Sequence, residues 1–565
     1  MRIKSILFIL VIIMNLTLVS CQSDYDDLSY EKLNNELNGG IYKNNDDIMD
    51  QGPVKGGTLN LFSTAPDTLN PLLTKNSYAS DFLSFIYEGL VALNEKQQPE
   101  PLLSDKWSVS SDGLIWNFHI RDGVQWSDGK AFTAEDVEYT FNFLLKANAD
   151  SAYKKQLQNI STYTAADSSN FRVALIKPNS FTPEMLTFPI LPAHLQDHAF
   201  DTADFKPVGT GPFKLEAYLK EKSVTLKKNE DWWYINASGG NSDNILLMDE
   251  ICIKLYKSAE DAINAFQVFD IDASGISMDD INKYASRTDM IIKKYPSREF
   301  EFLAFNLHNP VAADISVRKA VAAAVDRQKL LREILYGNGA VCDLPIHPDS
   351  WLWDGIKASL AVLSIAQSPR DILLEGGWKE RESGFYKTLG GISKKLEIEL
   401  LVNNNNSRRI LVAEGICRQL LEAGIAAKVT RLPWNSLYNQ IDTRKFTMAY
   451  AGCRITQVPD ISFLYSTNYL PAYLPLENNI GRNISGYNSQ EANSLISSLY
   501  AETDLEKKKS VFTNLKNILD TDLPYIGLFF LDNAVIYRDT VRGSLKPFVW
   551  NKYHDITGWY LPDFR

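Results

Sequence analysis

Short apolar runs alternate with longer amphipathic stretches along most of the chain beyond Gly56 and Gly57. The short runs are rich in β-branched and aromatic residues, which favour strands, and they occupy residues 58–63, 116–120, 171–175, 223–226, 250–255, 397–402, 426–431 and 525–531. The amphipathic stretches have helical periodicity, and they occupy residues 134–146, 317–324 continuing into 329–335, 408–423 and 491–499. This alternation predicts a mixed α/β fold.

The stretch 408–423 indicates how such a helix packs. We expect one apolar face to lie on a sheet, formed by Leu411, Val412, Ile416, Leu420 and Leu421. Gly424 follows the stretch at the place where a helix commonly ends, because glycine adopts the left-handed backbone conformation at little cost.

The first twenty residues have the pattern of an export signal. Arg2 and Lys4 precede an apolar run over 6–14, which is shorter than the roughly 20 residues of a membrane-spanning helix. Leu18-Val19-Ser20-Cys21 resembles the bacterial lipobox, whose cysteine receives a diacylglycerol, and two acyl chains hold a protein firmly on a bilayer. We therefore expect a signal peptide over 1–20, lipidation of Cys21, and an exported protein anchored to the outer face of the cytoplasmic membrane, facing the periplasm in a two-membrane cell.

The segment from Cys21 to Lys55 is rich in Asp, Glu, Asn and Gly and has no sustained period. Such a segment buries too little apolar surface to offset its chain entropy. We expect residues 21–55 to form a flexible acidic tether that holds the folded region away from the membrane.

Composition narrows the class of protein. Of the 565 residues 45% are hydrophobic, as in a packed globular protein, and a chain of this length is expected to divide into several domains. The net charge of −11 and the lack of long basic runs argue against nucleic acid as a partner. No CxxC pair is present; we expect free buried cysteines, with one disulfide as the alternative, at Cys252, Cys342, Cys417 and Cys453.

A series of short motifs follows in a fixed order along the folded region. It consists of Gly57-Thr58-Leu59, Leu69-Asn70-Pro71, Glu88-Gly89-Leu90, Pro101-Leu102-Leu103, Trp116-Asn117-Phe118, Ile120-Arg121-Asp122-Gly123-Val124, Trp126-Ser127-Asp128-Gly129, Phe132-Thr133-Ala134-Glu135-Asp136-Val137, Gly209-Thr210-Gly211-Pro212-Phe213, Val317-Arg318-Lys319-Ala320 and Gly376-Gly377-Trp378. This series resembles the family 5 extracellular solute-binding proteins of ABC importers, the oligopeptide- and dipeptide-binding lipoprotein group.

The resemblance implies a two-lobed periplasmic-binding-protein-like fold, the type II, three-domain variant with a discontinuous lobe I. Two crossings between the lobes would act as a hinge, and closure would bury a ligand in the cleft. The resemblance divides the chain into 56–88 as the first segment of lobe I, 89–205 as an inserted small domain, 206–305 as the second segment of lobe I, 306–521 as lobe II and 522–565 as the C-terminal segment of lobe I.

The resemblance also implies where the ligand lies. The family cleft borrows a Trp-containing segment and a strand with its following loop, which here run from Trp434 to Leu464. The candidate ligand-binding residues are Lys75, Asn76, Ser77, Trp434, Tyr450, Cys453, Arg454, Thr456 and Phe529. Trp434 offers a wide apolar wall with one donor, although a place in the core between lobes is the alternative.

One position departs from the family pattern. Thr456 stands where the family usually has an aspartate for a peptide's terminal amine, and Asp460 lies four residues later. Burying a ligand ammonium without a counter-charge costs several kcal/mol. The ligand is therefore N-blocked, neutral or anionic, or another carboxylate binds the amine. Arg454 suits a ligand carboxylate or phosphate, or a structural ion pair.

Motifs of enzymes and metal sites are missing. The sequence has no GxSxG elbow, P-loop or HExxH, and His194 and His198 lack a third candidate metal ligand. We expect no cofactor, no metal and no catalysis, and a monomer whose partners are a small-molecule or oligopeptide ligand and a membrane-embedded ABC permease. Two alternatives remain open at this point: an extracytoplasmic hydrolase or transferase on an α/β scaffold, and a lipoprotein that senses a signalling peptide without import.

Overall fold

The computed structural model describes residues 52–145, 150–195, 206–238, 245–284, 287–353, 367–469 and 482–562. Contacts divide the chain into Met1–Ile41 and Tyr42–Arg565, and every described residue belongs to the second unit. The expected signal peptide, Cys21 and almost all of the tether lie outside the described residues.

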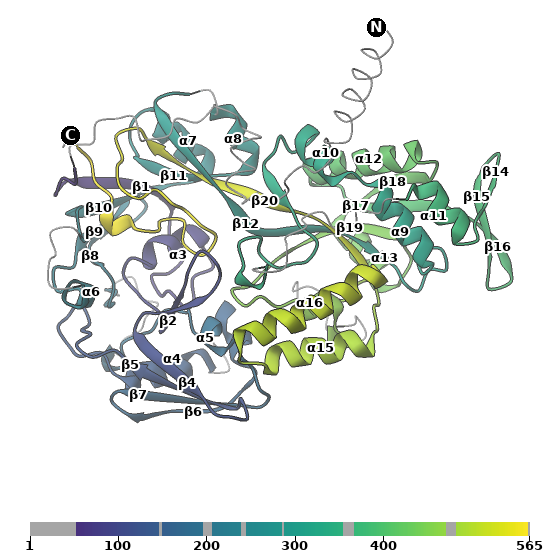
Figure 1. Ribbon diagram of the computed structural model, residues 1–565. Coiled ribbons are helices and arrows are strands. Elements are labelled where there is room, and N and C mark those ends of the chain that lie inside the picture. The colour runs from purple at the N-terminus through teal and green to yellow at the C-terminus, as the bar shows by residue number, and fades with distance from the viewer. Residues whose placement is uncertain are drawn as a thin grey trace, which may run out of the picture. The chain divides into compact units, whose positions relative to one another are not determined.

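One mixed sheet runs through the described region of the chain (Figure 1). Its strands, in spatial order, are β18 (Ala426–Leu432), β17 (Glu397–Asn403), β19 (Met448–Arg454), β12 (Met290–Phe305), β20 (Tyr525–Arg538), β11 (Ala273–Ile276), β1 (Thr58–Thr64), β10 (Glu250–Tyr256), β9 (Ser223–Lys228) and β8 (Phe213–Leu219), with β13 (Gly339–Val341) paired to β20. The pairs β1–β10, β1–β11, β17–β18 and β17–β19 are parallel, and the others are antiparallel.

The strands β12 and β20 are longer than the others and lie side by side in the middle of this sheet (Figure 1). Ile291 and Val535 pack into a core shared with β1 and β10. Leu303 and Phe529 pack into a second core, shared with the helices that follow β12. The two strands therefore connect two hydrophobic cores, and β20 is apolar along nearly its whole length because it is central and covered on both sides.

Smaller sheets complete the strands: β4 (Ser104–Val109), β5 (Ile115–Ile120), β7 (Asn170–Leu175) and β6 (Ile160–Asp167); β2 (Val91–Leu93) with β3 (Pro99–Pro101); and β14 (Lys379–Arg381), β15 (Gly384–Leu389) and β16 (Ile392–Lys395). The helices are α3 (Ser77–Leu83), α4 (Ala134–Leu145), α5 (Thr182–Met185), α6 (Trp233–Ala237), α7 (Ala259–Gln267), α8 (Met278–Tyr284), α9 (Ile315–Ala324), α10 (Arg327–Glu333), α11 (Pro369–Glu375), α12 (Ser407–Glu422), α13 (Trp434–Asp442), α14 (Ser462–Tyr465), α15 (Gln490–Ala501) and α16 (Leu505–Asp522). Short 3₁₀ helices are η2 (Ala152–Leu157), η3 (Ala193–Leu195), η5 (Trp351–Trp353), η6 (Thr467–Tyr469) and η8 (Ile556–Gly558).

The mixed α/β prediction is confirmed. Each predicted strand and helix is present, and its ends agree with the prediction within two residues, except for the end predicted at 531. Two differences have physical reasons. The stretch 317–335 is two helices, because the Asp326 side chain accepts a hydrogen bond from Lys329 N and begins α10 anew. Strand β20 continues seven residues beyond the predicted end at 531, since apolar residues continue past Asp532 and Asn533.

The predicted apolar face of 408–423 is wrong at two positions. Val412, Ile416 and Leu420 are buried, but Leu411 is 54% and Leu421 is 56% exposed. Steps of four residues keep 412, 416 and 420 on one side of a helix, whereas 411 and 421 lie about 100° away from their neighbours in that row. Ala413 and Cys417 fill the buried face in their place.

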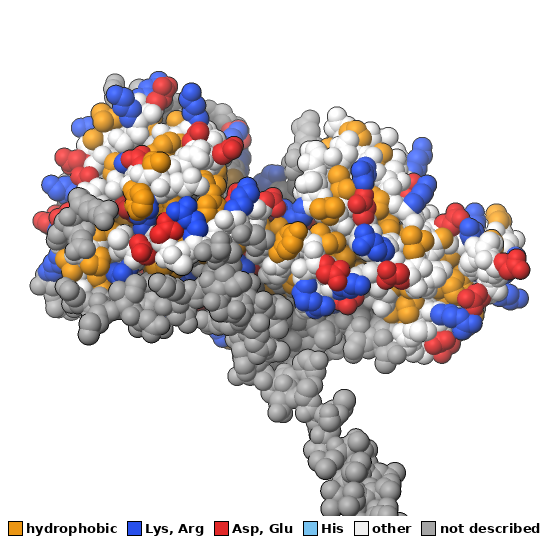
Figure 2. Space-filling view, turned by 90° about the horizontal axis from the view of Figure 1, so that it is seen from above, with side chains coloured by type: hydrophobic (Ala, Val, Ile, Leu, Met, Phe, Trp, Pro, Cys, Tyr) orange, Lys and Arg blue, Asp and Glu red, His pale blue; other side chains and the backbone are white. Residues whose placement is uncertain are grey.

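The exterior carries mixed charge. On the face seen in Figure 2, Lys and Arg side chains lie among Asp, Glu and apolar side chains, without a continuous basic patch. None of the helices among the described residues has the length and apolarity needed to span a bilayer. The four cysteines of the folded region are free.

A substitution at Gly209 tests how tightly the turn at 209–213 packs against Ile86. A Cβ at Gly209 would lie 1.9 Å from the backbone oxygen of Ile86, which also accepts a hydrogen bond from Gly211 N. We expect Gly209→Ala to lower the free energy of unfolding by more than about 2 kcal/mol, since backbone atoms must shift to admit the methyl group. Gly558→Ala, where nothing lies within 4 Å, is the control in a urea titration; equal effects of both variants would contradict this packing.

Candidate functional site

The candidate site lies where the middle of β12 and β20 meets the end of β19. Register with β20 is interrupted between Pro296 and Phe300, so that residues 297–299 leave the ladder. On the other side of β12, Glu299 is paired with Arg454, the last residue of β19. The interruption thus brings polar side chains of β12 beside the end of β19.

Charged groups from distant regions of the chain converge here. Asp81 of α3 forms an ion pair with Lys552, and these side chains are 29% and 17% exposed. Burial raises the pKa of the Asp81 carboxyl, and the positive charges of Lys552 and Arg454 act against that rise. Arg298 donates from Nε to the Ile455 carbonyl oxygen at 2.7 Å. We call Asp81, Arg298, Arg454 and Lys552 the junction cluster.

Aromatic rings surround the junction cluster. The Arg298 guanidinium lies 5.4 Å from the ring centroid of Trp550, and Lys552 Nζ lies 5.5 Å from that of Tyr78 and 5.1 Å from that of Tyr553. Burial is the main cause that raises the pKa of Tyr295, a β12 residue close to both Lys552 and Asp81. Cations over aromatic faces gain attraction that grows when water is excluded. The junction cluster therefore combines charged groups with aromatic faces.

A second feature lies on the 434–454 side of the site. Trp434 and Tyr438 of α13 stack with ring centroids 5.4 Å apart, and both are partly exposed. The Arg409 guanidinium lies 5.9 Å from the Trp434 ring and binds the buried Glu301 carboxylate through two nitrogens, at 2.8 Å each. Gly452 of β19 makes room for this pair, because a Cβ there would lie 2.2 Å from Arg409 Nη2.

The three residues expected from the 75–77 loop have different roles in the structure. Lys75 is exposed and forms an ion pair with Asp150. The Asn76 side chain accepts from Tyr78 N and Ala79 N and donates to Thr64 Oγ1 at 2.8 Å, so that it begins α3 and ties it to β1. Ser77 is the exposed first residue of that helix. The loop therefore positions Asp81 and Tyr78 of α3 at the junction cluster.

Of the residues expected from strands β19 and β20, Arg454 joins the junction cluster. Tyr450 is 2% exposed, and burial raises its pKa. Phe529 is fully buried in the core. Cys453 is partly buried, and burial raises the pKa of its thiol. Their side chains therefore support the sheet beneath the site.

Thr456 lies on the loop after β19, and the loop is tied to a distant turn. Thr456 is exposed, and its hydroxyl donates to the Val458 carbonyl at 3.0 Å. The fully buried Gln97, in the turn between β2 and β3, donates from Nε2 to the carbonyl oxygen of Gln457 at 2.9 Å. Asp460 is used locally, since its carboxylate accepts from Ser462 N at 2.6 Å.

Sequence reasoning missed Asp81, Arg298, Lys552 and Trp550. Each stands outside the motif series, and up to 471 positions separate them along the chain. The one available signal was the polar interruption of an apolar stretch at Ser297 and Arg298. Only the pairing of β12 with β19 and β20 reveals which chain segments meet there.

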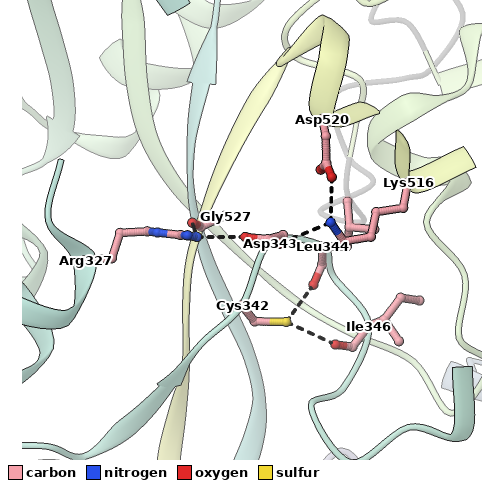
Figure 3. Close-up of polar contacts among 8 residues, drawn as sticks. All are labelled: Arg327, Cys342, Asp343, Leu344, Ile346, Lys516, Asp520 and Gly527. Carbon is pink, nitrogen blue, oxygen red and sulfur yellow. Dashed lines mark hydrogen bonds and ion pairs between the residues drawn. The ribbon is translucent and has the colours of Figure 1, made fainter. Parts of the chain in front are cut away.

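A further buried charge cluster lies beside β20, where the residues that follow β13 approach it (Figure 3). Arg327 Nη1 donates to Asp343 Oδ1 at 2.9 Å and to the Gly527 carbonyl at 2.8 Å. Lys516 lies 3.7 Å from the Asp343 carboxylate and 2.6 Å from that of Asp520. Burial raises the pKa of Asp343 to about 6, against the effect of Arg327. With its charges paired, the cluster joins α10 and α16 to β20 and borders a small cavity.

Within the described ranges, no group of three or more His, Cys, Asp or Glu side chains is placed to bind a metal ion. His194 Nε2 lies 2.7 Å from Asp128 Oδ2, and His198 is outside those ranges.

Comparison with known proteins identifies the family. Residues 98–472 match the model of the bacterial extracellular solute-binding proteins, family 5. Two Bacillus subtilis (strain 168) proteins are each 23% identical: the oligopeptide-binding protein AppA over 533 residues (90% of this chain, 92% of that protein) and the dipeptide-binding protein DppE over 505 residues (85% and 88%).

Solved structures agree on the fold. The periplasmic murein tripeptide-binding protein MppA, in an unliganded open form, has a TM-score of 0.76 at 18% identity and covers 91% of this chain and 99% of its own. Bacillus subtilis AppA in complex with a nonapeptide has a TM-score of 0.61 at 22% identity, covering 91% and 100%. Because the family model matches more than half of the chain, this protein belongs to the bacterial extracellular solute-binding proteins of family 5 and has their two-lobed α/β fold.

Proposed function

We propose that this protein is the extracytoplasmic receptor of an ABC importer and that it binds a peptide between its lobes without chemical turnover. The observation that carries the proposal is the convergence of the junction cluster: α3, β12, β19 and the C-terminal segment each contribute a charged side chain to one place. The relatives compared above are named for peptide binding, and their names describe no catalysis. The hydrolase or transferase alternative is not favoured.

The hinge of such a receptor would lie in β12 and β20. Support comes from the packing of these strands, whose two ends belong to different hydrophobic cores. On β12, the irregular register between Pro296 and Phe300 marks the place where the strand passes from one hydrophobic core to the other. On β20, Asp532 marks that place. The domain limits expected from the sequence remain predictions, with lobe I made of 56–88, 206–305 and 522–565, the inserted domain of 89–205, and lobe II of 306–521.

Thermal unfolding with added solutes tests the proposed ligand class. A ligand at 100 times its dissociation constant stabilises the native state by about 2.7 kcal/mol. A mixture of tripeptides to pentapeptides should therefore raise the melting temperature of the full-length protein, while mono- and disaccharides at equal concentration should not. A shift with saccharides alone would reject a peptide receptor.

Membrane attachment through Cys21 has a separate test, since Cys21 lies outside the described residues. Cys21→Ala should move the protein from the membrane fraction of the producing bacterium to its soluble extracytoplasmic fraction, because no acyl chains are attached. Cys252→Ala, which changes a partly buried free cysteine of the folded region, is the control and should stay with the membrane. Membrane retention of the Cys21 variant would contradict the lipid anchor.

A further inference from the structure

Two arginine side chains at the junction cluster keep unused hydrogen-bonding capacity. An arginine has five N–H donors. Arg298 uses Nε for the Ile455 carbonyl, and its other guanidinium nitrogens have no hydrogen-bond partner among the described residues. Arg454 is exposed at the end of β19 and takes part in no hydrogen bond or ion pair of its side chain with the residues that the structure describes.

The two guanidinium groups also lie close enough to repel one another. Burial and the neighbouring charge of Arg454 together lower the pKa of Arg298 to about 10. The carboxylate within range of Arg454, Asp81, is bound to Lys552. Glu299, the cross-strand neighbour of Arg454, is exposed and makes no ion pair with it. The junction cluster therefore contains three cations and one carboxylate, and this excess of positive charge favours an anion beside the arginines.

A third donor lies beside Arg298. The indole Nε1 of Trp550 is buried and lacks a hydrogen-bond partner in the described region of the chain. Arg298 lies over this indole ring. A buried donor without an acceptor costs about 1–3 kcal/mol, so that a shift of the indole toward an incoming acceptor would be favourable.

We propose that Arg298 and Arg454 form a subsite for an oxyanion of the ligand, which in a peptide is a carboxylate. The inference rests on the proposed peptide-binding function and adds the charge of the ligand to it. Guanidinium groups bind carboxylates through paired, charge-assisted hydrogen bonds, and the planar fork of arginine suits that geometry. The carboxylate belongs either to the peptide's C-terminus or to an Asp or Glu side chain.

Matched peptides measured by isothermal titration calorimetry distinguish these sources. The set consists of alanine-based pentapeptides that have glutamate or glutamine at one position in turn, each with a free or an amidated C-terminus. The full-length protein should bind at least one carboxylate form at least tenfold more tightly than its isosteric amide. The position of that carboxylate identifies the source.

The same titrations on variants assign the preference to the arginines. Arg454→Gln should reduce the carboxylate preference to less than threefold, Arg454→Lys should keep some of it, and Arg298→Gln should act like Arg454→Gln. Lys220→Gln removes an exposed charge elsewhere and should change nothing. Because Arg454 is exposed, its variants test the proposal even if Arg298→Gln unfolds.

Two negative outcomes are separable. Peptides that bind the original protein equally well as acids and amides overturn the oxyanion subsite and leave the peptide receptor intact, as does a preference that survives in both arginine-to-glutamine variants. If no peptide of the set or of the thermal-unfolding mixture binds, the proposed function itself fails.

Discussion

Arg409→Leu should lower the free energy of unfolding by about 3–5 kcal/mol. Glu301 is 2% exposed, and Arg409 provides three of its hydrogen bonds, at distances of 2.8 to 3.1 Å. Burial raises the pKa of Glu301, and the charge of Arg409 counteracts that rise. Removing one member of a buried ion pair leaves the other charge without compensation, and this costs far more than the pair contributes when intact.

Denaturant titrations at pH 7 measure the change in the free energy of unfolding, and two further variants identify its cause. Arg370→Leu breaks an ion pair with Glu380 in which the side chains are 56% and 44% exposed, and should cost at most about 1 kcal/mol. Adding Glu301→Gln to Arg409→Leu removes the orphaned charge and should recover some of the loss. An Arg409 variant as stable as the Arg370 variant would show that Glu301 is not buried as described.

Glu184→Gln should stabilise the protein at pH 8 and have little effect near pH 4.5. Glu184 is 2% exposed, and its Oε2 atom has no hydrogen-bond partner among the described residues. Burial raises its pKa to about 7 from 4.5, with the charge of Lys508 acting in the opposite direction. The contribution of Glu184 to stability is therefore fully present below pH 4.5 and is lost as the pH rises through 7. A pKa difference of this size corresponds to a gain of about 3 kcal/mol in the free energy of unfolding for the glutamine variant above pH 7.

Glu184 lies where two distant segments of the chain connect. Ser180, just before α5, donates its backbone N–H to the Tyr500 carbonyl at 2.7 Å, and Lys508 of α16 lies 4.2 Å from the ring centroid of Phe181. Unfolding free energies of both forms between pH 4.5 and 8 measure the effect, with the exposed Glu382→Gln as control. A pH-independent difference would show that Glu184 stays ionised in the native protein.

The sequence predicted local structure well and the site only incompletely, for a physical reason. Strand and helix patterns are local, so 58–63 and 408–423 could be identified from their own residues. Strand β12 was missed because Lys293, Lys294 and Arg298 interrupt its apolar pattern, while its stability comes from neighbours on both sides. Helix α12 shows the limit of periodicity, since Leu411 and Leu421 are leucines on the exposed side.

The site needs contacts that no local pattern contains. Arg454 was found because the resemblance places the cleft within residues 434–464, but its neighbours Asp81 and Lys552 come from opposite ends of the chain. Phe529 and Asn76 were expected at the ligand, and both have structural roles, in the core and at the start of α3. Whether any candidate residue contacts a ligand remains a prediction.

The most direct test of the receptor account is native mass spectrometry of the full-length protein after incubation with a degenerate mixture of short peptides. The account predicts a mass increase of one peptide per chain, and recovery of that peptide uncleaved after denaturation. A protein that gains no peptide mass, or that releases cleaved fragments, would contradict it.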